Sequence, residues 1–328
     1  MEHAVLAKQV IKSYFLTDPQ LKFLRHNENI TYKVTDGTDQ KSYLLRIHTP
    51  ASEGFAGVQN TLQGIQSEMI LLRELNNNKS LCVQKPIANS CGEYVTIYYT
   101  HECDTPYFAT LLSWIEGATL TLKEENGSEI AFAIGETLAT FHETSRRRMP
   151  IQNLIRPMYD AERIDVAISE LQVGVELNLY SRGQYQTIQE VLELVKGQLR
   201  ELDKQENSWG LIHADLQLGN IIMHESRPCL IDFSLSGYGY DLFDVGSASS
   251  MLPSDLRGAF LNGYSAKRAF TLNDLRYVEG LIFMDIFISY VFFIRDSNRN
   301  SWIKKNAAEI CDTLCMDFLE GKSVYYCF

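Results

Sequence analysis

Hydrophobic and polar positions along the 328-residue chain predict strands first and helices later. Apolar and polar residues alternate over 30–34, the polar stretch T-D-G-T-D-Q follows, and 43–47 is apolar again, as in a β-hairpin. Apolar residues at helical spacing predict a helix over 62–75. Two further strand-like runs cover 94–100 and 108–115, so the first third of the chain is expected to be rich in β-structure.

Beyond Gly117 the pattern becomes helical. Helices are predicted over 130–144, 161–171, 187–202 and 280–294, in addition to one near the start of the chain over 5–14. Short strand-like runs occur near Leu211, at 221–223 and at 230–233. The segment L-S-W-I-E-G-A-T-L reads as a hinge. The expected organisation is therefore an N-terminal lobe over 1–112, a hinge over 113–117 and a mostly helical C-terminal lobe over 118–328.

Net charge, the apolar runs and the cysteine spacing argue against several classes of protein. A net charge of −11 argues against a nucleic-acid binder, which would present a basic face. The longest apolar run, 281–294, is too short to span a bilayer and contains Asp285. The first residues lack the apolar block of a signal peptide, so a soluble cytoplasmic protein without a membrane partner is expected. The seven cysteines include no C-x-x-C, and we expect reduced thiols and no zinc site.

The stretch L-I-H-A-D-L-Q-L-G-N-I-I-M-H-E-S-R-P-C-L-I-D-F carries the candidate chemistry. Asp215 and Asn220 lie five residues apart in one polar loop, and Asp232 ends a second apolar run. A carboxylate such as Asp215 can orient or deprotonate a hydroxyl that attacks phosphorus. The Asn220 amide oxygen and the Asp232 carboxylate are ligands for Mg²⁺ held against nucleotide phosphates. The pattern therefore indicates a phosphoryl-transfer site.

Each of these residues also has a purely structural interpretation. Asp215 can cap a helix, Asn220 can close a turn and Asp232 can begin one. Arg46, in the run L-L-R-I, shares a face with Leu44, and its pattern alone favours a solvated surface position.

Two further features bear on the nucleotide. Glu68, in the middle of a predicted helix, is either an exposed charge or a partner for Arg46. The chain contains no G-x-G-x-x-G. If the turn His26-Asn27-Glu28-Asn29 covers phosphates, it must do so through backbone N–H groups and its Asn side chains, which makes Asn27 a candidate nucleotide contact.

Together these motifs resemble the aminoglycoside phosphotransferase and choline kinase superfamily, near type II homoserine kinases and stress-response kinases. The family pattern H-G/A-D-L-H-x-G-N, then I-D-F-D/G, then D-L-x-x-[IVL] corresponds here to HADLQLGN, IDFS and DLFD. ENITYKV, YLLRIH, SWIEG and LATFHETS resemble its first strand, third strand, hinge and following helix. The resemblance covers most of the chain. It implies an α+β, bilobal protein-kinase-like fold, with a β-rich N-terminal lobe and a mostly helical C-terminal lobe.

The resemblance also implies roles for individual residues. Asp215 would be the catalytic residue, supported by His213 and Gln217 in its loop, and Asn220 and Asp232 would bind Mg²⁺. Arg46 would contact the α/β-phosphates of ATP or GTP and pair with Glu68. The backbone of a hinge formed by Ser113, Trp114 and Ile115 would receive the base. Asp241 would brace the catalytic loop, its structural alternative being a helix N-cap.

The sequence departs from the family pattern at two positions, where Gln217 replaces the usual His and Ser234 an acid. The leading hypothesis is a Mg²⁺-dependent kinase that phosphorylates a hydroxyl of a small molecule such as an aminoglycoside, an amino alcohol or homoserine. A pseudokinase that binds nucleotide or a partner is one alternative. A Ser/Thr protein kinase of the stress-response type is another, although only seven residues separate Phe233 from Asp241. The oligomeric state and the acceptor are left open, and acids such as Asp160, Glu162 and Asp165 are either acceptor contacts or solvated.

Overall fold

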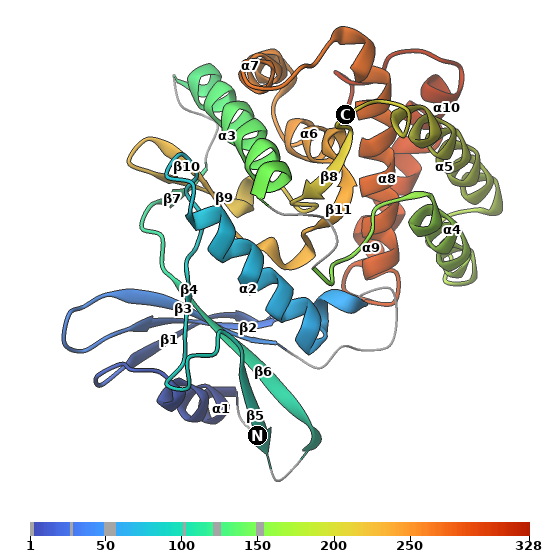
Figure 1. Cartoon of the computed structure of the whole chain (residues 1–328). Coiled ribbons are helices and arrows are strands. Elements are labelled where there is room, and N and C mark those ends of the chain that lie inside the picture. The colour runs from blue at the N-terminus through green and yellow to red at the C-terminus, as the bar shows by residue number, and fades with distance from the viewer. Residues whose placement is uncertain (1–2, 27–28, 49–56, 101–102, 121–125, 149–153) are drawn as a thin grey trace. The chain divides into compact units, whose positions relative to one another are not determined.

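The computed structural model describes residues 3–26, 29–48, 57–100, 103–120, 126–148 and 154–328. The chain divides into two compact units, which Figure 1 shows by element. Unit 1 contains residues 1–119, 148–156 and 221–234, and unit 2 contains residues 120–147, 157–220 and 235–328. The first boundary, after residue 119, therefore lies just beyond the predicted hinge at 113–117. The segments 148–156 and 221–234 belong to unit 1, so the second unit is not one continuous stretch of chain.

An antiparallel sheet of six strands forms the centre of unit 1 among the described residues. The strands run in the order β1-β2-β3-β6-β4, and β5 also pairs with β6. Their bounds are β1 Gln20–His26, β2 Asn29–Thr35, β3 Ser42–His48, β4 Pro86–Ile87, β5 Thr96–Thr100 and β6 Cys103–Ser113. The predicted hairpin is β2–β3, with Tyr32 opposite Leu45. The alternating pattern did not reveal β1, whose side chains are mostly exposed.

The two faces of this sheet pack against different helices, because successive side chains of a strand point in opposite directions. Leu45 and Ile47 of β3 join the apolar cluster that packs under α1, His3–Val10. Arg46 points the other way and contacts α2, Leu62–Asn76. Figure 1 shows α1 and α2 on opposite faces of the sheet. The apolar face thus builds a core with α1, and the other face carries the buried contact between Arg46 and α2.

A small second sheet explains why residues 221–234 belong to unit 1. Strand β9, Ile221–His224, pairs with β10, Arg227–Leu230, and with β7, Ala118–Thr119. A disulfide joins Cys82 to Cys229 in β10. The expectation of reduced thiols is therefore wrong for these two cysteines, whose spacing of 147 residues gave no signal of their proximity.

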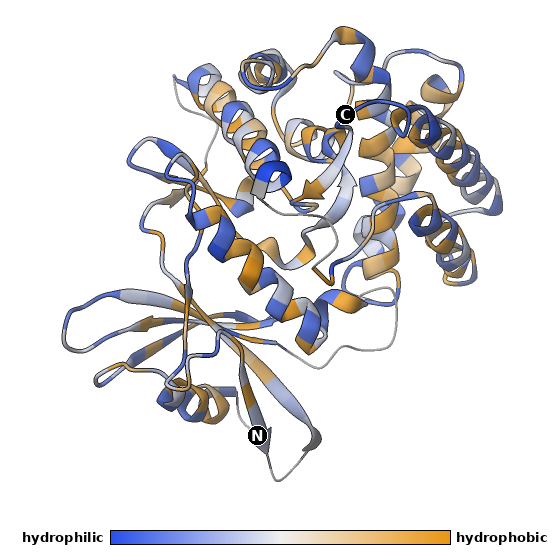
Figure 2. Ribbon diagram, in the orientation of Figure 1, coloured by the Kyte–Doolittle hydropathy of each residue, from blue (hydrophilic) through white to orange (hydrophobic). Residues whose placement is uncertain are grey.

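Unit 2 is mostly helical among its described residues. Its elements are α3 Gly127–Arg148, α4 Ala161–Glu176, α5 Arg182–Leu202, β8 Trp209–Ile212, β11 Gly237–Tyr240, α6 Asp241–Ser250, α7 Ser254–Ser265, α8 Leu275–Phe293, α9 Asn300–Ile310 and α10 Leu314–Leu319. Helix α8 packs against α4, α5 and α6. Figure 2 shows α8 as largely hydrophobic, as expected for a central helix. No helix in the described ranges has the length and apolar character of a membrane span.

The Cys82–Cys229 bond should contribute measurably to stability. Replacing Cys229 with Ala is expected to lower the free energy of unfolding by about 2–5 kcal/mol, because the cross-link restricts a long loop in the unfolded chain. Chemical denaturation without reductant measures this loss. Cys91→Ala is the matched control, since Cys91 is free and exposed. Equal stability of the wild type with and without reductant would contradict the prediction.

Candidate functional site

The catalytic-loop candidate follows β8 and is held by a carboxylate from α6. Ala214 has a left-handed backbone, with φ of 61°, which a non-glycine residue adopts only when its surroundings enforce it. The two oxygens of Asp244 accept hydrogen bonds from the His213 N–H at 2.7 Å and the Ala214 N–H at 2.8 Å. Asp244 therefore fixes the backbone immediately before Asp215.

A histidine in α3 supports this carboxylate. His142 Nε2 lies 3.0 Å from Asp244 Oδ2, and both side chains are fully buried. Because a carboxylate only accepts, Nε2 must carry a proton. The other ring nitrogen, Nδ1, contacts the Tyr264 hydroxyl at 3.0 Å. The two contacts fix the ring and connect α3 and α7 to the loop.

The contacts described for Asp241 lie outside the loop that the family resemblance expects it to brace. Asp241 is the first residue of α6, and its carboxylate pairs with Arg146 at 2.9 Å and with Arg268. Its N–H donates to the Ser208 carbonyl oxygen. Among the described residues, the acid in the D-L-F-D segment that contacts the loop is Asp244, three residues later.

The Asp215 carboxylate is oriented by two amides of its own loop. Gln217 Nε2 donates to Asp215 Oδ1 at 2.7 Å, and Asn220 Nδ2 donates to Oδ2 at 2.9 Å and to the Asp215 carbonyl oxygen. These acceptors fix the Asn220 amide, because only its NH₂ group can face them. No donor in the described part of the chain contacts Asn220 Oδ1, so this oxygen can act as a metal ligand.

A buried ion pair forms the centre of the polar face of unit 1. Arg46 Nη1 lies 2.7 Å from Glu68 Oε1, and the two side chains are 3% and 1% exposed. The surface position favoured by the pattern of Arg46 is therefore wrong, and the pairing implied by the family resemblance is present. Burial acts to lower the pKa of Arg46, but attraction to Glu68 and Asp232 outweighs it and raises that pKa. The Arg46 guanidinium therefore keeps its charge although it is buried.

Asp232 lies beside this pair with a left-handed backbone, φ 63°. The Ser234 hydroxyl donates to its Oδ1 at 2.9 Å, and Arg46 Nη2 lies 3.5 Å from the same oxygen. Arg25 from β1 pairs with Oδ2 at 3.2 Å. A carboxylate oxygen is the type of ligand that a hard cation prefers, so Asp232 is a suitable candidate.

His48 contributes a neutral ring to the same face. Loss of solvation by burial, and then the nearby Arg46 guanidinium, lower the pKa of His48 to about 3. Its Nε2 hydrogen-bonds the Thr110 hydroxyl at 3.3 Å. His48 therefore adds no charge to the cluster at neutral pH.

Backbone hydrogen bonds hold the first two residues of the predicted hinge to two different segments of unit 1. Ser113 N–H donates to the Lys85 carbonyl oxygen, and Trp114 N–H donates to that of Ser42. Gly117 approaches β9 so closely that a Cβ atom would lie 2.3 Å from the Met223 carbonyl oxygen. Of the three candidate hinge residues, Ile115 alone has a backbone N–H with no partner among the described residues, which makes it the available donor for a base.

Each unit contains one oxygen donor that suits magnesium. No group of three or more His, Cys, Asp or Glu side chains that could hold a metal occurs in the described ranges. Magnesium commonly takes one or two protein oxygens and completes its shell with phosphate and water, so the Asp232 carboxylate of unit 1 and the Asn220 amide oxygen of unit 2 are each suitable ligands. Asn27, the other candidate phosphate contact, lies outside the described residues.

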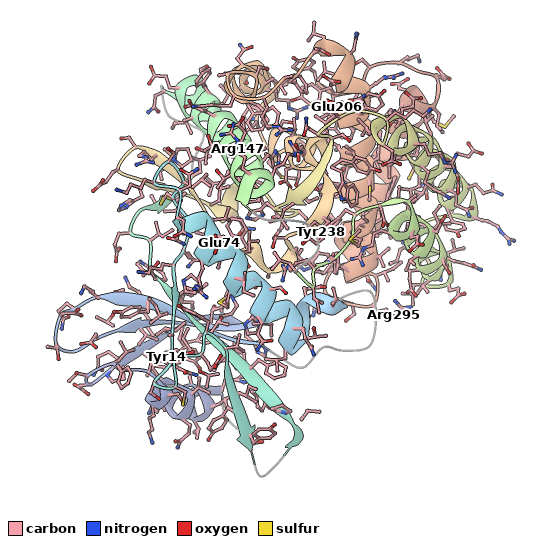
Figure 3. All side chains as sticks on the ribbon, viewed as in Figure 1. Tyr14, Glu74, Arg147, Glu206, Tyr238 and Arg295 are labelled. Atoms are coloured by element: carbon pink, nitrogen blue, oxygen red, sulfur yellow. A yellow bond between two sulfur atoms is a disulfide. The ribbon has the colours of Figure 1, made fainter. Side chains whose placement is uncertain are left out.

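The sequence patterns did not identify several residues of the site. His142 lies in the motif L-A-T-F-H-E-T-S, but only its side-chain contact reveals its role. Arg25 and Arg156 carried no motif at all. The acceptor candidates Asp160 and Asp165 have structural partners: Asp160 caps α4 through Arg163 N–H, and Asp165 pairs with Lys196. Figure 3 shows the side chains on both units, with Tyr238 labelled on β11.

Asp244→Asn tests the bracing of the loop. An amide has one oxygen where Asp244 uses two, so its NH₂ group must face a donor and leave at least one buried N–H unsatisfied. We expect the free energy of unfolding to fall by about 2–4 kcal/mol, measured by chemical denaturation. Asp255→Asn on the exposed first turn of α7 is the control. A loss no larger than that of the control would refute the bracing role.

Comparisons with known proteins agree with this geometry. The phosphotransferase enzyme family model matches residues 20–281. A search of curated proteins finds no match. Among solved structures, a microcompartment-associated aminopropanol kinase is similar at 22% identity, TM-score 0.78, over 97% of this chain and 98% of that one.

Two other structures are similar at lower identity. An amicoumacin kinase in complex with AMP-PNP, Ca²⁺ and Ami matches at 17% identity, TM-score 0.75, over 95% and 94% of the two chains. Choline kinase from Cryptosporidium parvum matches at 14% identity, TM-score 0.66, over 97% and 99%. These likenesses confirm the predicted α+β, kinase-like fold. With the family model covering most of its length, this chain belongs to the phosphotransferase enzyme family.

Proposed function

We propose that this protein is a Mg²⁺-dependent kinase that transfers the γ-phosphate of ATP or GTP to a hydroxyl of a small molecule bearing an amino group. Asp215 orients and deprotonates the acceptor hydroxyl, and Asn220 and Asp232 are the metal ligands. Bound magnesium would neutralise the developing charge on the phosphate oxygens. The remaining work of the protein is to position the reactants, which can account for a large part of such rate enhancements.

The observation that carries this proposal is the way Asp215 is held. Its carboxylate is half-buried and receives two amide donors, while the preceding backbone is fixed by Asp244. A general base needs an acceptor oxygen in a defined place before the substrate arrives. A carboxylate that merely capped a helix would not require a braced left-handed residue directly before it.

Two arginines of unit 1 support a phosphate donor. Arg25 and Arg46 both lie at the Asp232 carboxylate, and the Arg25 side chain is 57% exposed. Guanidinium groups suit phosphate oxygens, so these two arginines can receive the phosphates of a nucleotide. The amicoumacin kinase is described with AMP-PNP and Ca²⁺, which supports a nucleotide and a divalent cation here.

Asp285 supports an acceptor with an amino group. It interrupts the apolar helix α8, hydrogen-bonds Ser247 of α6 and lies near Asp244, which itself holds the catalytic loop. Loss of solvation raises its pKa to about 7, so an ammonium group would stabilise its ionised form. Similar structures are named for aminopropanol and choline, both of which carry a cationic nitrogen and a hydroxyl.

One observation favours the alternative of a nucleotide-binding protein without transfer activity. Arg25 and Arg46 both contact the Asp232 carboxylate, and either can compete with a metal ion for it. A coupled ADP-release screen over aminopropanol, ethanolamine, choline, homoserine and aminoglycosides distinguishes a kinase from a protein that only binds nucleotide. If the protein binds nucleotide but releases ADP with none of these acceptors, the binding-only function is selected.

Asp215→Asn should abolish most turnover and leave nucleotide binding intact. Loss of a positioned general base is expected to reduce kcat by about 10²–10⁴-fold. ADP release gives the rate, and calorimetric titration with AMP-PNP gives the affinity. Gln217→Ala, which leaves the carboxylate in place but removes one donor, should lose much less. Near-normal turnover by Asp215→Asn would overturn the proposed mechanism.

Acceptor affinity should depend on pH through Asp285. Because its pKa is raised to about 7, Asp285 is protonated below that pH and ionised above it. The KM for an amino alcohol should therefore fall as pH rises from 6 to 8, and Asp285→Asn should raise KM and remove this trend. Asp255→Asn, on the exposed first turn of α7, is the control. An unchanged pH profile in Asp285→Asn would exclude Asp285 from acceptor binding.

A further inference from the structure

Arg156 is a buried arginine in unit 1 that no motif identifies. Arg156 is 4% exposed. Its guanidinium group donates hydrogen bonds to three backbone carbonyl oxygens. These are Gly64 at 3.1 Å, Phe233 at 2.8 Å and Ser234 at 2.6 Å. A fork of fixed N–H donors can satisfy several acceptors at once, which the single ammonium group of a lysine does less well.

One set of partners belongs to the helix that carries Glu68. Gly64 lies in the first turn of α2, and the N–H of Ile155, next to Arg156, donates to the Ser67 hydroxyl at 2.9 Å. Ser67 immediately precedes Glu68, the partner of Arg46. Residues 155–156 therefore hold the first two turns of α2 through both a side chain and the backbone.

The other set of partners belongs to the turn that follows Asp232. Arg156 holds the carbonyl oxygens of Phe233 and Ser234, and the Ser234 hydroxyl in turn donates to the Asp232 carboxylate. Asp232 has a left-handed backbone, which costs about 1–3 kcal/mol unless neighbouring contacts enforce it. Arg156 supplies contacts on the residues directly after this strained position.

We propose that Arg156 is a positioning residue for metal binding, because it joins the helix that bears Glu68 to the turn that orients Asp232. This inference rests on the proposed role of Asp232 as a Mg²⁺ ligand. Arg156 itself touches neither metal nor substrate in this scheme. It acts by keeping the Asp232 carboxylate and the Arg46–Glu68 pair in one arrangement, so that binding a metal–nucleotide complex requires no reorganisation.

The experiment compares Arg156→Lys with Arg257→Lys. Arg257 of α7 is the matched control, because it is 2% exposed and also donates to backbone carbonyl oxygens, including those of Leu252 and Ser250. Binding of Mn²⁺ in the presence of AMP-PNP is measured by electron paramagnetic resonance, and stability by denaturation. Residues that orient metal ligands typically change metal affinity by about 10–100-fold. We expect a loss in that range for Arg156→Lys and wild-type affinity for Arg257→Lys.

Chemical rescue separates positioning from general stability. Added guanidinium ion should partly restore Mn²⁺ affinity to Arg156→Ala, because it can occupy the space of the missing group, and should not change Arg257→Ala. If neither Arg156 variant folds, Ser67→Ala removes only the Ile155 contact and should weaken Mn²⁺ binding by a smaller factor. Wild-type affinity in every folded variant of this group would overturn the inference.

Asp232→Asn makes the two levels of the proposal distinguishable. If Asp232→Asn weakens Mn²⁺ binding while folded Arg156→Lys does not, the metal assignment stands and the positioning role of Arg156 is refuted. If Asp232→Asn binds Mn²⁺ as the wild type does, the metal assignment fails, and the role of Arg156 is refuted with it. Weakening by both variants supports both.

Discussion

The loop that carries Asp215 depends on the hydrogen bonds that the Asp244 carboxylate accepts. Two consecutive backbone N–H groups, of His213 and Ala214, point toward one side chain because Ala214 has a left-handed backbone. That conformation is unfavourable for alanine, and buried N–H groups without acceptors would add to the cost. One buried acid offsets both, and the proton that His142 holds on Nε2 keeps it in place. These contacts fix the backbone directly before Asp215, the proposed catalytic residue.

Unit 1 also contains a left-handed residue held by charged side chains, but here the charged groups are arginines. Asp232 also has a left-handed backbone, and here arginines enforce the arrangement: Arg46 and Arg25 contact its carboxylate, and Arg156 the carbonyl oxygens that follow. A buried ion pair such as Arg46–Glu68 contributes little net stability, because desolvation of both charges opposes their attraction. Under the proposed function, the pair would hold the Arg46 cation in a fixed place for the phosphates of the nucleotide.

The local elements of this fold were largely readable from the pattern of apolar residues. The hairpin of β2 and β3, helix α2 and the long helices α3, α4, α5 and α8 were predicted, with ends that moved by a few residues. Strand β1 was missed because most of its side chains are exposed, and α6 and α7 because short helices with buried polar residues lack a clear apolar stripe. The predicted strand over 230–233 ends at Leu230, since the left-handed Asp232 cannot continue it.

The sequence by itself determined the family and the candidate residues Asp215, Asn220 and Asp232, because their chemistry and spacing are local properties of two short motifs. Only the tertiary structure decided which groups hold them. The contacts of Asp244 with the loop, the pairing of Arg46 with Glu68, the Cys82–Cys229 bond and the contacts of Arg156 all join segments far apart in the chain. Such contacts depend on which faces of distant elements pack together, and the pattern along a single segment carries no information about its partner.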